Sequence, residues 1–198
     1  MKIQKSTIVL IAVAAVLVLW GVSSYNKLVS AQEEVNKAWS NVEATYQRRM
    51  DLINQLVPIV ESNAKIEKNA LKEVIEMRAS ATQLKLSVDD LTDENLEKFQ
   101  KAQDQLGGSL SRLMAVSEAY PELKFNERFQ DLQVQVEGNE NRIIEARRVY
   151  NEVATTYNIK IRRFPTNLLA GIFAFERKGL FQASEGADKA PEIKINID

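Results

Sequence analysis

An uncharged apolar run near the amino terminus constrains this 198-residue chain more than any other feature. Residues Ile8 to Val22 read IVLIAVAAVLVLWGV and contain no charged side chain. A helix over residues 6–23 would be about 27 Å long at about 1.5 Å per residue, close to the roughly 30 Å hydrocarbon core of a bilayer. Trp20 and Tyr25 fall where aromatic side chains line a membrane interface. We therefore expect residues 6–24 to form a transmembrane helix after a short polar segment.

A cleaved signal peptide is the alternative interpretation of this run. The apolar region of a signal peptide usually has about 7–15 residues and precedes a cleavage site with small residues, and residues 22–24 (Val-Ser-Ser) have that character. We favour a retained anchor because the run is at the long end of this range and the helical pattern continues through Tyr25. Lys2 and Lys5, in the polar segment of residues 1–5, give only a slight bias toward a cytoplasmic amino terminus, since lysines also follow the span.

The chain from residue 25 to residue 164 has the three- and four-residue apolar spacing of amphipathic helices. Glycine (7) and proline (4) are scarce, which favours long helices. Pro58 is expected to kink or end the first helix near Val57, and Thr92 precedes two acidic residues in the pattern of a helix N-cap. About four helices with short connections predict an all-α fold, an antiparallel four-helix bundle of residues 25–164.

Two glycines interrupt one of these helices. Gly107 and Gly108 lie inside a predicted helix, where each costs about 1 kcal/mol relative to alanine. A close helix crossing would offset this cost, so we expect the pair to form a packing notch, with a local kink as the alternative.

The tail, residues 165–198, is expected to be mostly irregular. Because the bundle faces are expected to be complete without it, the tail must either fold back over the end of the bundle or dock on something else. We predict that a short apolar patch in the tail contacts a partner or a second copy. The residues of this patch are Leu168, Leu169, Ile172, Phe173 and Phe175. Isoleucines alternate with polar residues after Pro191, a pattern typical of a strand that could add to another chain's sheet edge.

The sequence contains neither cysteine nor histidine. This excludes a thiol nucleophile, a disulfide, a thiolate metal site and an imidazole base. A net charge of -1 disfavours nucleic-acid binding. We therefore predict no catalytic residue, no cofactor-binding residue and no metal ligand. An enzyme or enzyme regulator that uses buried carboxylates is the alternative.

Asn139 and Glu140 interrupt the apolar stripe of the last long helix. An unpaired carboxylate there would cost several kcal/mol, so Glu140 is expected to pair with Arg48 or Arg49. A buried ion network that sets helix packing is the preferred interpretation, and an acid/base or metal site is the alternative. The predicted network consists of Arg48, Arg49, Asp51, Glu118, Glu140, Arg142 and Arg147, with Arg148 beside it.

Several motifs in order give the chain a resemblance to a known family over nearly its whole length. They are Tyr25-Asn26-Lys27-Leu28-Val29, Ala38-Trp39-Ser40-Asn41-Val42, Arg48-Arg49-Met50-Asp51-Leu52-Ile53, Ser117-Glu118-Ala119-Tyr120-Pro121-Glu122-Leu123, Glu140-Asn141-Arg142-Ile143, Ala146-Arg147-Arg148-Val149-Tyr150-Asn151, Tyr157-Asn158, Arg163-Phe164-Pro165 and Ala190-Pro191. On these residues the chain resembles the LemA family of bacterial membrane proteins. Two departures are Asn54, where the family usually has proline, and Asn139, where threonine is usual.

The resemblance implies one amino-terminal membrane segment, an extramembrane four-helix bundle, no catalytic motif and no cofactor. It also implies an accessory role beside a membrane-bound zinc metalloprotease of the heat-shock type. We accordingly expect a non-catalytic interaction or scaffold protein of the bacterial cytoplasmic membrane. It would contact lipid through its amino-terminal helix and either self-associate as a homo-oligomer or serve a membrane protease or an envelope stress process.

Overall fold

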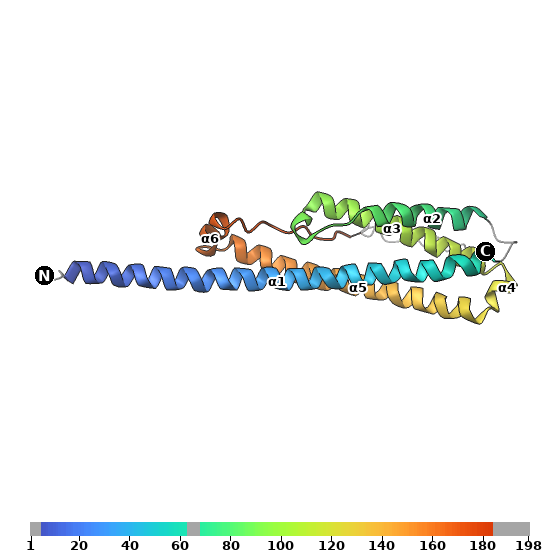
Figure 1. Ribbon diagram of the computed structural model, residues 1–198, viewed down its shortest axis with the longest axis horizontal. Helices are drawn as coiled ribbons and strands as arrows, with labels where there is room; N and C mark the ends of the chain where they lie inside the picture. Colours follow the sequence, from blue (N-terminus) through green and yellow to red (C-terminus); the bar gives the residue numbers. More distant parts are fainter. Residues whose placement is uncertain (1–4, 63–67, 184–198) are drawn as a thin grey trace, which may run out of the picture.

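The computed structural model describes residues 5–62 and 68–183, and every regular element in these ranges is helical (Figure 1). The predicted all-α class is confirmed. In chain order the elements are α1 (Lys5–Glu61), α2 (Lys68–Gln83), the 3-10 helix η1 (Val88–Asp90), α3 (Asp93–Ser117), α4 (Pro121–Lys124), α5 (Glu127–Arg162) and α6 (Thr166–Ile172).

A single helix of 57 residues, α1, contains both the apolar run and the first bundle helix. The helix passes without a break through the expected boundary between residues 24 and 25. Beyond this point, Leu28, Val35 and Trp39 are buried against other helices. The apolar side chains of residues 8–19 are exposed, and this part of α1 extends beyond the bundle (Figure 1). Among the described residues, α1 is the one helix that is long and apolar enough to cross a membrane. A signal sequence can have the same length and composition.

Of the two outcomes expected near Val57, an end of the helix is not found there, because α1 continues through Pro58 to Glu61. Pro58 lies in the last turn, where its missing N–H removes one helical hydrogen bond without disturbing a long following segment. Its carbonyl still accepts a hydrogen bond of 3.1 Å from the N–H of Ser62. Leu56 and Val60 are both buried, so packing against the bundle holds this final turn.

The four long helices pack as two antiparallel pairs, α1 with α5 and α2 with α3 (Figure 1). The core consists of two clusters along the bundle. The cluster nearer the apolar run, which we call the near core, is rich in aromatic residues. Its Trp39 is in edge contact with Phe99 and Tyr150 at ring-centroid distances of 5.6 Å each. The distal cluster is mostly aliphatic and includes Leu56 and Leu106. This separation of aromatic from aliphatic residues follows from the sequence, since the buried aromatic side chains of α1 and α5 are concentrated in the part of each helix nearer the apolar run.

After α6 the chain turns at Ala174 and runs back over the bundle in an extended conformation (Figure 1). We call residues 175–183 the strap. Phe181 of the strap is buried, stacks on Trp39 at 6.2 Å and makes an edge contact with Tyr150 at 5.5 Å. The near core therefore contains a residue of the tail.

The expectation that the bundle faces are complete without the tail is therefore wrong. The α2–α3 hairpin covers only part of the α1–α5 pair (Figure 1), and the strap covers aromatic surface beside it. Phe175, predicted to contact a partner, is half-buried and packs against the near core. The isoleucine alternation after Pro191 lies outside the described residues.

Replacing Phe181 by alanine should lower the free energy of unfolding by about 3–5 kcal/mol, the usual cost of deleting a buried phenylalanine side chain. Urea unfolding of the full chain in detergent, followed by the fluorescence of the neighbouring Trp39, measures this change. Phe125→Ala is the matched control, because Phe125 is 79% exposed whereas Phe181 is 6% exposed. Equal effects of the two substitutions would mean that the strap is not part of the core.

Candidate functional site

The most deeply buried charged group on the core side of α1 is the guanidinium of Arg49, whose side chain is 5% exposed. Its Nε donates a hydrogen bond of 2.9 Å to Oε1 of Glu140 on α5, and its Nη2 donates to the other carboxylate oxygen. Its Nη1 donates to the backbone carbonyl of Gln103 on α3 at 2.9 Å. One side chain thus connects three helices through a bidentate ion pair and a backbone hydrogen bond.

Two neighbours shape the space around this guanidinium. The ring of Tyr46, one turn earlier in α1, lies with its centroid 5.4 Å from Arg49 Cζ. On α3, a Cβ built on Gly107 would lie 3.5 Å from Arg49 Nη2, so alanine would just touch the guanidinium and a larger residue would displace it. Gly108 faces open space. The expected packing notch is therefore at Gly107 alone, and α3 is not broken there.

Burial raises the pKa of the Tyr46 hydroxyl to about 12, and this effect outweighs the opposing charges of Arg147 and Arg49. Tyr46 is therefore a neutral part of the core at ordinary pH. Glu140 differs, because 36% of its side chain remains exposed. The ion pair thus has one partner buried inside the bundle and the other at its surface.

The other residues of the predicted network do not join this pair. They lie at exposed or half-buried positions, and the contacts that they make are separate from the Arg49–Glu140 pair. Arg48 donates to Gln135, Asp51 accepts from Gln47, Arg147 pairs with Asp104 at 3.1 Å and lies over the Phe181 ring, Arg148 pairs with Glu145 and Glu152, and Glu118 and Arg142 are exposed. The structure therefore divides the predicted network into one buried pair and several separate contacts.

A second polar feature, which sequence reasoning missed, holds the strap on α5. The side-chain amide of Asn158 donates to the carbonyl of Lys178 at 2.8 Å and accepts from its N–H at 2.9 Å. Asn151, two turns earlier, makes the same two bonds to Phe181 at 2.8 and 2.9 Å. Each amide thus satisfies both backbone groups of one extended residue, as a neighbouring strand does in a β-sheet.

Contacts from α3 and the loop before it complete this arrangement. Gln100 on α3 makes the same paired bonds to Gln182, at 2.9 and 3.1 Å. The N–H of Gly179 donates to the carbonyl of Leu91 at 2.7 Å. A Cβ on Gly179 would lie 2.7 Å from backbone atoms of Thr92 and Asp93, so glycine alone fits this close approach.

The buried Lys178 also has a specific partner. Its Nζ donates to the carbonyl of Val88 at 2.9 Å, while the Tyr150 hydroxyl donates to the carbonyl of Gly179 at 3.0 Å. We call Asn151, Asn158 and Gln100, together with the strap residues that they bind, the clamp. The sequence contains a signal for its α5 residues, since Tyr150-Asn151 and Tyr157-Asn158 repeat one dipeptide with a seven-residue spacing on one face of a helix. The tail residues of the clamp carry no such signal.

The buried ion pair connects helices to one another, and the clamp connects helices to the strap. Both arrangements therefore serve packing. Among residues 5–62 and 68–183, no group of three or more acidic side chains is placed to hold a metal ion. The predicted patch is divided: Leu168, Ile172 and Phe173 are exposed on and after α6, Leu169 and Phe175 are half-buried, and Ala170 faces the bundle.

These features define an α-helical bundle built on a long, apolar amino-terminal helix. The chain belongs to the LemA family, whose family model matches residues 38–195. It is similar to the magnetosome protein MamQ 2 of Paramagnetospirillum magneticum, with 28% identity over 183 residues that cover 83% of this chain and 66% of that protein. The protein LemA of Metamycoplasma hominis is 27% identical over 160 residues, which cover 81% of this chain and 69% of that protein.

A third relative, the magnetosome protein MamQ of Magnetospirillum gryphiswaldense, is 25% identical over 181 residues, which cover 83% of this chain and 66% of that protein. The match thus spans just under two thirds of the length of the MamQ proteins.

Replacing Glu140 by alanine should lower the free energy of unfolding by about 2–3 kcal/mol, because it leaves the buried Arg49 without its anion. This is below the roughly 3–5 kcal/mol expected for a fully buried pair, since water can reach the vacated surface position. Urea unfolding monitored by circular dichroism measures the loss.

Glu145→Ala is the matched control on the same helix, because Glu145 pairs with Arg148 at the surface. Its effect should be much smaller, because both partners of this pair are solvated. A Glu140→Ala variant as stable as this control would mean that the ion pair does not hold the three helices together.

Proposed function

We propose that this protein is a non-catalytic, membrane-anchored interaction protein that holds a helical bundle at a set distance from a bacterial cytoplasmic membrane. The observation that carries the proposal is the continuity of α1, which runs as one helix from the exposed apolar run into the buried core. An unbroken helix transmits the position and direction of the span directly to the bundle.

Exposure of the apolar run supports the anchor. The side chains from Ile8 to Leu19 have no packing partner in the bundle, and such a long apolar surface is unfavourable in water. A bilayer core is the environment that matches its length. The unbroken passage of α1 from this run into the core favours retention over removal as a signal peptide. We propose a cytoplasmic amino terminus, on the small lysine bias before the span.

The polar groups of the bundle support a non-catalytic role. Both carboxylate oxygens of Glu140 accept hydrogen bonds from Arg49, so this carboxylate is held in a bidentate ion pair that fixes its position between the helices. The amides of the clamp are likewise bonded to backbone groups. These pairings favour helix packing and strap attachment over the alternative of carboxylate chemistry.

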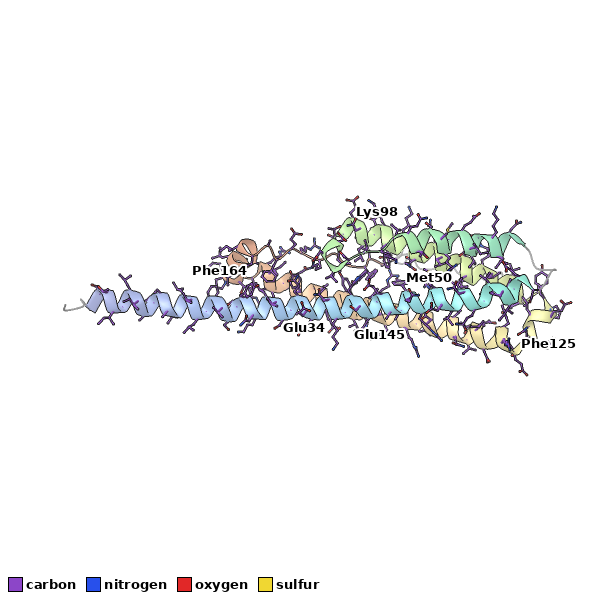
Figure 2. All side chains as sticks on the ribbon, in the orientation of Figure 1. Glu34, Met50, Lys98, Phe125, Glu145 and Phe164 are labelled. Carbon is purple, nitrogen blue, oxygen red and sulfur yellow. The ribbon has the colours of Figure 1, made fainter. Side chains whose placement is uncertain are left out.

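We further propose that the bundle binds other proteins, either a second copy of this chain or a membrane-bound metalloprotease. The bundle exposes isolated apolar side chains away from the apolar run. They include Phe125, at the far end of the bundle (Figure 2), and Val134 and Ile144 on α5. The LemA resemblance supports the protease as partner.

Alkaline carbonate extraction of bacterial membranes tests the anchor. We expect the protein to stay in the membrane pellet, and Leu10→Arg combined with Leu17→Arg to release it, because two charges at the centre of the span are costly in lipid. Val134→Arg combined with Ile144→Arg, on exposed positions of α5, should leave retention unchanged. Recovery of a soluble mature protein beginning near Tyr25 would refute the anchor.

Light scattering of the full chain in detergent, with cross-linking in intact membranes, tests the interaction role. We expect a mass of more than one protein copy per micelle, or a cross-link to a membrane metalloprotease. The anchored variant Val134→Arg with Ile144→Arg shows whether exposed residues of α5 take part. A strictly monomeric protein that cross-links to neither class of partner would contradict the interaction role.

A further inference from the structure

The helix α6 leaves a group of large apolar side chains uncovered. Phe164, just before the helix, is 75% exposed, and Ile172, at its last residue, is 73% exposed. Leu168 and Phe173 are also exposed. Leu168 and Ile172 are four residues apart on α6, whereas Ala170 is buried against the bundle. We call the four exposed residues the α6 face.

This face lies where α1 leaves the bundle toward the apolar run. The ring of Tyr25 is 4.8 Å from that of Phe173 and 5.9 Å from that of Phe175. Figure 1 shows α6 beside α1 at the end from which the free part of α1 extends, and Figure 2 labels Phe164 there. Tyr25 follows the last residue of the run, Val22, by three residues, or about 4.5 Å of helix. The α6 face is therefore at the depth expected for lipid headgroups.

The charges around α6 suit an anionic lipid surface. From Lys160 to Phe175 the chain contains three cationic residues and no acidic residue. Lys160 and Arg163 line one groove together with Trp20, Lys27 and Glu34 of α1, which places them at the same level of the molecule and gives the groove three basic side chains and one acidic side chain. Lys160, Arg162 and Arg163 form no salt bridge with any residue in the described part of the chain, so their charges remain open to anions.

We infer that the α6 face inserts into the headgroup–acyl boundary of the leaflet from which α1 emerges, while Lys160, Arg162 and Arg163 bind anionic headgroups. The inference rests on the proposed anchor, which brings the lipid surface to this end of the bundle. Apolar side chains flanked by basic residues are the pattern of an interfacial anchor. A second copy is a poorer occupant, because its identical basic cluster would face this one.

This second attachment would determine the orientation of the bundle. A single span allows the bundle to tilt with α1 in any direction. Contact of α6 with lipid adds a point beside the helix axis, which restricts the direction and the size of this tilt. The strap follows α6 directly and is clamped to α3 and α5, which connects the lipid contact to the bundle.

The absence of cysteine from the sequence allows a direct test by single nitroxide labels on the full chain. Ile172→Cys places a label on the α6 face, Val16→Cys places one in the apolar run, and Ile144→Cys places one on an exposed position of α5. The labelled proteins are reconstituted in vesicles of phosphatidylcholine and phosphatidylglycerol. Electron paramagnetic resonance then compares collision of each label with oxygen, which concentrates in lipid, and with a water-soluble nickel chelate.

We expect the oxygen-to-nickel collision ratio to be severalfold higher at residue 172 than at residue 144, and highest at residue 16. A water-like ratio at 172 with a lipid-like ratio at 16 would overturn the inference and leave the anchor intact. A water-like ratio at residue 16 would overturn the anchor and the inference together. Low collision with both reagents at residue 172 would show that α6 lies in a protein interface, and this result would also overturn the inference.

The basic residues have their own test in the same vesicles. Arg162→Gln combined with Arg163→Gln should lower the collision ratio at residue 172, because the headgroup contact is weakened. Lys124→Gln combined with Arg128→Gln removes the same charge from exposed positions at the far end of the bundle and should leave the ratio unchanged. Equal ratios in both variants would overturn the assignment of the headgroup contact to Arg162 and Arg163.

Discussion

The position of every other element depends on α1, because its 57 residues belong to two different environments. Its first part is apolar on all sides, as a helix surrounded by lipid requires. Its second part buries only one face, against α5 and the α2–α3 hairpin. Since no loop separates these parts, a rotation of the span would rotate the bundle as well. The membrane contact we infer for α6 acts on the same rigid unit from the side.

Hydrogen-bonding requirements explain how an extended segment can belong to a helical core. Helices satisfy their own backbone groups, whereas an extended chain on a helical surface leaves N–H and C=O groups without partners. Asn151, Asn158 and Gln100 supply such partners, so Phe181 is buried beside Trp39 with both of its backbone groups hydrogen-bonded to Asn151. The clamp and the aromatic contact therefore depend on each other.

The Arg49–Glu140 pair contributes differently from the apolar core. Apolar contacts along the bundle tolerate small shifts of one helix past another, whereas a bidentate ion pair requires one register. Arg49 also bonds to the backbone of Gln103, and Gly107 leaves room for its guanidinium. The pair thus matches α1 to α3 and α5 at one level, a role that fits its position between the two apolar clusters.

The sequence by itself determined the helical class, the apolar run and the positions that face the core, because these depend on local periodicity and composition. It also predicted a partner for Glu140, because a carboxylate on an apolar stripe requires one. It did not predict where α1 ends, since burial of Leu56 and Val60 holds the turn that contains Pro58. Nor did it place Phe181, Lys178 and Gly179, whose partners on α3, α5 and the intervening loop are distant in the chain. Only the tertiary structure brought the strap to its amides and α6 to Tyr25, because the surface left uncovered by the α2–α3 hairpin is not a property of any local segment.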